Sequence, residues 1–156
     1  MSRNHFSDIA NLASFTDPNV AELILTRNRL KTFNKWPFDD LEGSRCTSLK
    51  LAKAGFIMTM KKRIPSAKCI CCLKVLTWEK DDIPLREHLR KMPSCRLART
   101  IHRKKEICMT VSDVVAILSM REVATAVDSQ FTEDIKMIES HLEYDQNLVD
   151  KIPKKC

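Results

Sequence analysis

Two cysteines with two residues between them, followed by a histidine and a third cysteine, constrain the fold of this chain more than any other feature. The spacing is Cys69-x2-Cys72, then fifteen residues, then His88-x6-Cys95. Cysteines at this interval on a tight turn present both sulfurs to one ion, and a histidine and a cysteine complete the set. Three thiolates and one imidazole fill the tetrahedral shell of zinc and leave no position for water. The pattern therefore predicts one structural zinc ion, which stabilises folding and performs no chemistry.

The chain has seven cysteines, so a competing interpretation is that they are scattered buried thiols. The N-terminus shows no signal peptide and no stretch is long enough to span a bilayer, so we expect a nuclear or cytosolic protein. Disulfides are rare there, which favours metal binding for clustered cysteines. Cys71 also lies in the cluster and could replace a neighbour, but Cys72 has the usual interval from Cys69. No second zinc site is predicted, because no matching ligands accompany Cys46, Cys108 and Cys156.

The first part of the chain reads as a small α+β unit, since only two glycines in 156 residues argue against a many-turned β fold. Asp17-Pro18 predicts the start of a helix with an apolar face that ends at Trp36-Pro37. Thr47 or Ser48 is expected to cap a short helix that Gly55 terminates. Strands are expected at 56–60, in the segment leading into Cys69, and at 75–78, forming a short three-stranded antiparallel sheet. Pro84 opens a helix that carries His88.

Beyond Cys95 the pattern changes to a long segment without Gly or Pro until Pro153. Apolar residues recur there at heptad spacing, with one four-residue step, which predicts an amphipathic helix over 110–150. A helix of about 40 residues is roughly 60 Å long and cannot bury its whole apolar face on a small domain. We therefore expect a partner helix, although a self-dimerising coiled coil or a helix folded back on the zinc domain would fit the same pattern. The predicted apolar stripe comprises Ile117, Met120, Ala124, Val127, Phe131, Ile135, Ile138 and Leu142.

The predicted organisation has five parts: an N-terminal extension (1–16), a zinc domain (17–98), a basic linker (99–109), the long helix (110–150) and a tail (151–156). Residues 29–98 carry 16 Lys/Arg against 7 Asp/Glu, a net charge of +9, whereas residues 99–156 are close to neutral. The basic front half favours an acidic or phosphorylated partner, or is simply a solvated surface. The basic run 99–105 reads as a nuclear-import or DNA-contacting patch, or as a solvated linker.

Two function classes fit the sequence poorly. An enzyme would need reactive groups, but the only Cys–His grouping is predicted to bind the metal, and no phosphate-binding loop is visible. A nucleic-acid binder would suit the charge, but only 6% of residues are aromatic and no base-reading motif is present.

Several motifs together resemble the baculoviral-inhibitor-repeat (BIR) family. The match covers about residues 27–98 and comprises Arg29-Leu-Lys-Thr-Phe33, Trp36-Pro37-Phe38, Leu51-Ala-Lys-Ala-Gly55-Phe56, the zinc spacing, Trp78-Glu79 and Glu87-His88. A single such domain followed by one long helix is similar to the short, survivin-like branch of the family. Two positions depart from the family: one residue is missing near Thr77, and Ile83 stands where an aspartate commonly precedes the proline.

The resemblance implies a peptide groove beside the third strand. In the family an extended peptide adds a strand to this edge, and its N-terminal ammonium meets a carboxylate that corresponds to Asp82. Trp78 would form the wall for a small first side chain, with Glu79 and Asp81 as further acids for a basic tail. Lys74 and Lys91 would hold the phosphate of a phosphothreonine in a histone tail. Alternatively Trp78 is plain core, Asp82 caps the helix opened by Pro84, and both lysines are solvated.

The resemblance also implies partners for the long helix, namely helices of a borealin-like protein and of the inner centromere protein, which localise an Aurora-type kinase. The expected function is thus a non-enzymatic adaptor of a chromosomal passenger-type complex in chromosome segregation and cytokinesis. It would act at the nucleus, the chromosome and centromere, the spindle midzone and the cytoplasm, with a homodimer conceivable and no membrane partner. The alternative is an apoptosis regulator that binds N-terminal Ala peptides or inhibits a caspase.

Overall fold

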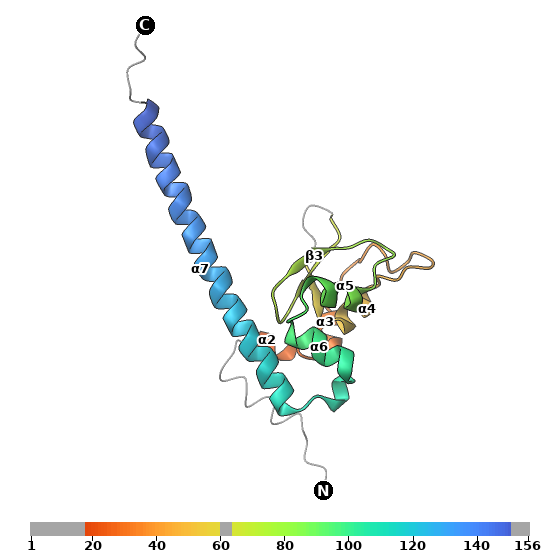
Figure 1. The fold of residues 1–156 in the computed structure, drawn as a ribbon. Helices are drawn as coiled ribbons and strands as arrows, with labels where there is room; N and C mark the ends of the chain where they lie inside the picture. The colour runs from red at the N-terminus through yellow and green to blue at the C-terminus, as the bar shows by residue number, and fades with distance from the viewer. Residues whose placement is uncertain (1–17, 60–63, 151–156) are drawn as a thin grey trace. The chain divides into compact units, whose positions relative to one another are not determined.

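The computed structural model describes residues 18–59 and 64–150, with side chains as far as residue 143. The chain divides into two compact units, Met1–Glu122 and Val123–Cys156. The predicted cap at Asp17, the predicted extension 1–16 and the predicted tail 151–156 lie outside the described residues. The elements are α2 (Pro18–Glu22), α3 (Thr26–Leu30), α4 (Ser48–Lys53), β1 (Phe56–Met58), β2 (Ser66–Cys69), β3 (Val75–Thr77), α5 (Pro84–Lys91), α6 (Arg96–Arg103), η2 (Glu106–Cys108) and α7 (Val111–Asp150) (Figure 1).

The three strands form one antiparallel sheet in the order β1-β2-β3, which confirms the predicted fold class. The register pairs Phe56 with Cys69 and Ala67 with Leu76. Phe56, Ala67 and Cys69 are fully buried, whereas Val75 in β3 is exposed. The sheet thus presents one face to the core and leaves β3 at its edge, as is usual for small antiparallel sheets.

The short helix α4 begins and ends as the sequence predicts. The Thr47 hydroxyl accepts a hydrogen bond from the backbone N–H of Lys50 at the helix start. Gly55 follows the helix with φ +94°, a conformation that disfavours a side chain. A Cβ there would lie 2.7 Å from Cδ2 of Leu97, so only glycine lets α6 approach the end of α4 closely.

The predicted helix from Pro18 towards Trp36 is instead two short helices, α2 and α3. The cause is Arg29, which is fully buried and donates hydrogen bonds to the carbonyls of Leu23 and Ile24 at 2.7 Å each. Its Nε donates to the carbonyl of Ala52 at 2.8 Å. A regular helix would use those first two carbonyls internally, so tertiary hydrogen bonding overrides the local helical spacing.

The segment predicted as a basic linker is largely folded. Helix α6 covers its first part and the 3-10 turn η2 its last. Leu97 and Ala98 are fully buried, and α6 contacts α5. The carboxylate of Glu106 in η2 accepts from the backbone N–H of Thr26 and pairs with Arg29. These contacts attach α6 and η2 to the core. The basic residues of α6 occupy its outer, exposed face.

Helix α7 begins with a reciprocal cap. The Asp113 carboxylate accepts from the backbone N–H and the hydroxyl of Thr110, and the Thr110 hydroxyl accepts from the N–H of Asp113. Lys104 donates to the same carboxylate, and these partners lower the pKa of Asp113 to about 2. The cap explains why the long helix begins here, one residue after the predicted start.

The first turns of α7 belong to the core of the first unit, which corrects part of the predicted stripe. Ile117 is only 1% exposed and Met120 packs against the same core, so neither is free for a partner helix. Arg121 donates to the carbonyl of Ile70 at 2.6 Å in the segment that carries the cysteines. The stripe therefore divides near Glu122, where the first unit ends.

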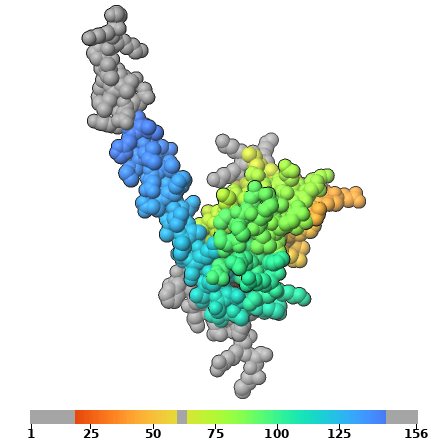
Figure 2. All heavy atoms as spheres, viewed as in Figure 1, coloured from red at the N-terminus to blue at the C-terminus, as the bar shows by residue number. Residues whose placement is uncertain are grey.

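In the second unit α7 is drawn as blue spheres in Figure 2, and its large apolar side chains as far as residue 143 are exposed. Phe131 is 64% exposed, and the other exposed apolar residues are Val123, Val127, Ile135, Met137, Ile138 and Leu142. No helix among the described residues is long and apolar enough to cross a membrane.

Candidate metal centre and peptide groove

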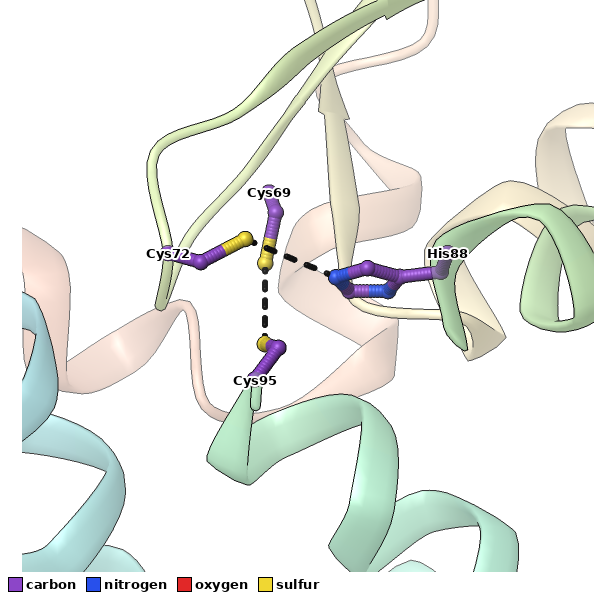
Figure 3. Close-up of side chains that lie close together, drawn as sticks. All are labelled: Cys69, Cys72, His88 and Cys95. Atoms are coloured by element: carbon purple, nitrogen blue, oxygen red, sulfur yellow. Dashed lines mark hydrogen bonds between the residues drawn. The ribbon is translucent and has the colours of Figure 1, made fainter. Parts of the chain in front are cut away.

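The end of β2, the turn after it, α5 and the residue before α6 bring the predicted zinc ligands together. Cys69 ends β2, and Cys72 lies in the turn before β3, which the N–H of Cys69 closes by donating to the carbonyl of Lys74. His88 lies in the second turn of α5, and Cys95 directly precedes α6. Figure 3 shows the four side chains pointing toward a common centre from these elements. Leu73 adopts φ +59° in the turn, a conformation that costs a residue with a side chain about 1–2 kcal/mol.

The distances between the ligand atoms fit a tetrahedral zinc ion. All four lie within 4.8 Å of one another. The sulfurs of Cys69 and Cys95 are 3.9 Å apart, and the Cys72 sulfur lies 3.6 Å from Nε2 of His88. Zinc–sulfur bonds of about 2.3 Å at tetrahedral angles place two sulfurs about 3.8 Å apart. The two measured distances therefore fit ligands of one tetrahedral zinc ion.

A hydrogen bond outside the cluster sets the tautomer of His88. Nδ1 of His88 lies 2.8 Å from the carbonyl oxygen of Ala54, which can only accept, so Nδ1 carries the proton. Nε2 is therefore the ring nitrogen that faces the cysteines and is left to bind a metal. The ring also packs against Phe56, with centroids 4.6 Å apart. The orientation of the ligand is thus fixed before any metal binds.

The electrostatics of the cluster favour a cation. Hydrogen bonds from Cys69, Cys71 and Cys72 lower the pKa of Cys95 far below its usual value, and burial raises that of Cys69. Burial also disfavours the His88 imidazolium, but hydrogen bonds to Cys72 and Cys95 outweigh it and raise its pKa to about 9. Zinc binds cysteine as a thiolate and histidine as a neutral imidazole, so its binding displaces protons from Cys69 and His88, whose pKa values are raised.

Cys71 contacts the ligand cysteines but is not one of the four clustered ligands. It is fully buried, and its thiol donates to the carbonyl of Ile117 in α7 at 3.6 Å. Its backbone N–H donates to the sulfur of Cys69 at 3.3 Å, an arrangement that stabilises a thiolate. This geometry favours Cys72 over Cys71 as the ligand and gives Cys71 a packing role.

The residues predicted for the peptide groove differ in exposure. Lys74, Glu79, Asp81 and Lys91 are exposed, and Asp82 is half-buried. Asp82 accepts from the N–H of Glu79 at 2.8 Å and closes that turn. The alternative that Asp82 caps α5 is wrong, because the N-cap of α5 is Ile83 and no side chain caps it.

Trp78 is 4% exposed and packs edge-on against Phe56, with centroids 4.9 Å apart. The alternative assignment of Trp78 to the core is thus consistent with its burial. Its indole N–H is nevertheless buried without a hydrogen-bond partner among the described residues. A buried donor without a partner costs about 1–3 kcal/mol, so the packing of Trp78 against Phe56 carries this cost.

Comparisons with known proteins identify the family. Residues 29–99 match the family described as BIR, the Inhibitor of Apoptosis domain. The chain is 36% identical to Baculoviral IAP repeat-containing protein 5 of Mus musculus over 64% of this chain and 70% of that protein. The chain belongs to the BIR family. Its similarity to the protein of the same name from Rattus norvegicus is 35% identity over 67% of this chain and 72% of that protein. This single BIR domain is of the survivin-like type, and its Cys69, Cys72, His88 and Cys95 form the site of one structural zinc ion.

Solved structures are also similar to this chain. One of them is a crystal structure of DIAP1 BIR1 bound to a Grim peptide, with 33% identity, 54% of this chain and 78% of that chain covered, and a TM-score of 0.42.

Sequence reasoning missed the buried side of α6 and the structural role of Arg29. Leu97, Ala98 and Ile101 are spaced as one face of a helix, and this spacing was available to predict α6. For Arg29 no such signal exists, because burial of a guanidinium among backbone carbonyls depends on residues distant in sequence.

Proposed function

We propose that this chain is a non-enzymatic adaptor of a chromosomal passenger-type complex. Its relatives indicate a BIR protein with a role in the cell cycle or apoptosis. The adaptor role is more specific than that indication. The zinc domain would read a phosphorylated histone tail, and α7 would dock helices of borealin-like and inner-centromere-protein partners. An Aurora-type kinase would be recruited indirectly, at chromosomes, centromeres and the spindle midzone, with the cytoplasm as a further location.

The observation that carries the proposal is the exposed apolar part of α7. Val127, Phe131 and Ile138 are each more than half exposed although they recur at heptad spacing. Exposed apolar area of this extent on one helix marks an interaction surface. Ala124, which is small, would let a partner helix approach closely, and Phe131 would supply buried area. The available stripe runs from Ala124 to Leu142, shorter at its start than the sequence predicted.

The groove supports the second half of the proposal through the chemistry of its residues. β3 is an edge strand, so its outer backbone groups are available to an added peptide strand. The acids Glu79, Asp81 and Asp82 suit a basic tail with a free ammonium group. Lys74 and Lys91 are exposed cations that could hold a phosphate as point charges.

The helix part is tested by reconstituting the full chain with the two partner helices and measuring the mass of the complex by light scattering. Phe131→Glu should release the helices, because a carboxylate in a buried apolar interface is strongly unfavourable. Ser129→Glu is the matched control, since Ser129 is exposed on α7 but lies off the stripe. A complex that forms equally with both variants would refute the assignment of this face.

The groove part is tested by calorimetric titration of the full chain with histone-tail peptides, phosphorylated on threonine or not, and with an N-terminal Ala peptide. The proposal requires tighter binding of the phosphorylated tail, weakened by Lys74→Ala or Lys91→Ala. Arg99→Ala, which removes an exposed cation from α6, is the control. Preference for the Ala peptide, with indifference to phosphate, would favour the alternative function of apoptosis regulation, which Asp82 and Trp78 fit equally well.

A further inference from the structure

A pocket of about 360 Å³ lies in the first unit among α4, α5 and α6. It shares no lining residue with the zinc centre or with the predicted groove. Its apolar surface comes from Ile83 and Leu85 at the start of α5 and from Ile101 in α6, with Ala54 and Pro84 completing it. α5 contacts both of the other helices, so the pocket is built on packed elements and not on loops alone.

Three cations surround this apolar surface. Arg45, Lys50 and Lys53 all line the pocket and are exposed, and no acidic residue lines it. Lys50 is held in place by donating to the carbonyl of Ser44 at 3.2 Å. Among the described residues, no carboxylate forms an ion pair with Arg45, Lys50 or Lys53. The pocket is therefore apolar inside and positive at its rim.

Ile83 is the residue that gives this pocket its character. It occupies the N-cap position of α5, where aspartate, serine, threonine and asparagine are favoured because their side chains cap the helix. Isoleucine makes no such cap. An aspartate here would both stabilise the start of α5 and bring a negative charge to the pocket. The isoleucine thus gives up helix capping and contributes apolar pocket surface instead.

We propose that this pocket docks a short segment of a partner protein in which one apolar side chain is flanked by carboxylates. The volume is near the lower end for ligand pockets and suits a single large side chain. Carboxylates on either side of that anchor would face Arg45, Lys50 and Lys53. A nucleic-acid strand is a poorer match, because no aromatic residue lines the pocket to stack a base. This surface is distinct from the two surfaces of the proposed function.

The proposal assigns different roles to the two kinds of residue. The apolar anchor would set the lifetime of the complex, and the rim cations would set the association rate and its salt dependence. Binding should therefore weaken as ionic strength rises, since exposed charges are screened beyond about 8 Å at 0.15 M salt.

The test begins with selection of 12-residue peptides from a random displayed library on the zinc-loaded full chain. Enriched peptides are expected to share an apolar residue flanked by Asp or Glu. One enriched peptide is then labelled, and its affinity is measured by fluorescence anisotropy. Lys50→Glu combined with Lys53→Glu should weaken it at least tenfold. Arg99→Glu combined with Lys105→Glu changes the net charge equally, away from the pocket, and should change affinity less than twofold.

Ile83→Asp supplies the second variant. It should also weaken binding at least tenfold, while the new aspartate caps α5, so a melting temperature at or above that of the wild type is expected. The proposal is overturned if the enriched peptides lack acidic residues. It is also overturned if their binding survives Ile83→Asp and is lost in Lys74→Glu, which would place them in the groove, or if a 12-nucleotide single strand binds more tightly at the same cations.

Discussion

Removing one zinc ligand should unfold the first unit, whereas removing the neighbouring buried cysteine should not. Cys95→Ala leaves three ligands and opens the closed shell. Structural zinc contributes about 10–16 kcal/mol of apparent binding free energy at neutral pH in small zinc domains. Whole domains are stable by only about 5–15 kcal/mol, so the loss is comparable to the entire stability. Cys71→Ala removes one buried sulfur and its weak bond to Ile117, at a cost of about 1–2 kcal/mol.

The assay is zinc content by mass spectrometry together with thermal unfolding by circular dichroism, on the full chain. We expect one zinc per chain and a slightly lowered melting temperature for Cys71→Ala, and no zinc with loss of the cooperative transition for Cys95→Ala. Both cysteines are fully buried, so the pair separates ligation from packing. A Cys71→Ala protein without zinc, or a folded and zinc-loaded Cys95→Ala protein, would refute the ligand assignment.

Three further predictions concern the same unit. Gly55→Ala should destabilise it by about 1–3 kcal/mol in urea unfolding, because the new Cβ meets Leu97 at 2.7 Å and φ is positive. Gly43→Ala should cost less, since nothing lies near its Cβ, and equal costs would show that packing at Gly55 is irrelevant. Arg29→Met should cost about 3–5 kcal/mol in the same assay, because it leaves the carbonyls of three residues buried without donors. Below about pH 9, zinc affinity should fall by more than about tenfold per pH unit, because binding displaces a proton from the His88 imidazole and another from the Cys69 thiol, whose pKa values are both raised. Calorimetry in buffers of different ionisation enthalpy measures the protons released, and release of one or none would contradict the reasoning.

The metal centre could be predicted from the sequence because its information is local. Two cysteines at an interval of three positions must lie close together, and Pro84 and Pro93 bracket the helix that carries His88. The structure adds the second layer, in which the carbonyl of Ala54 fixes the histidine tautomer. That carbonyl could not be predicted, because any residue supplies one and only the fold determines which lies within reach.

The length of the long helix was predictable, but which residues of its apolar face are buried and which are exposed was not. Heptad spacing predicted one continuous stripe, and the backbone is indeed helical from Val111 to Asp150. Spacing carries no information on what covers each position, so it could not show that Ile117 packs into the zinc domain while Phe131 is exposed. The distinction arises because α6 and η2, predicted as a linker, instead fold onto the core.

Departures from a family pattern are informative where the structure shows what they change. Ile83 replaces a residue that would cap α5, and the cap is missing in the structure, so the substitution brings no benefit to the stability of the helix. A change that weakens a helix start and adds apolar surface to a cation-rimmed pocket is difficult to explain by folding alone. Binding accounts for both effects together, because the same isoleucine that fails as a cap provides the surface that an apolar anchor would contact.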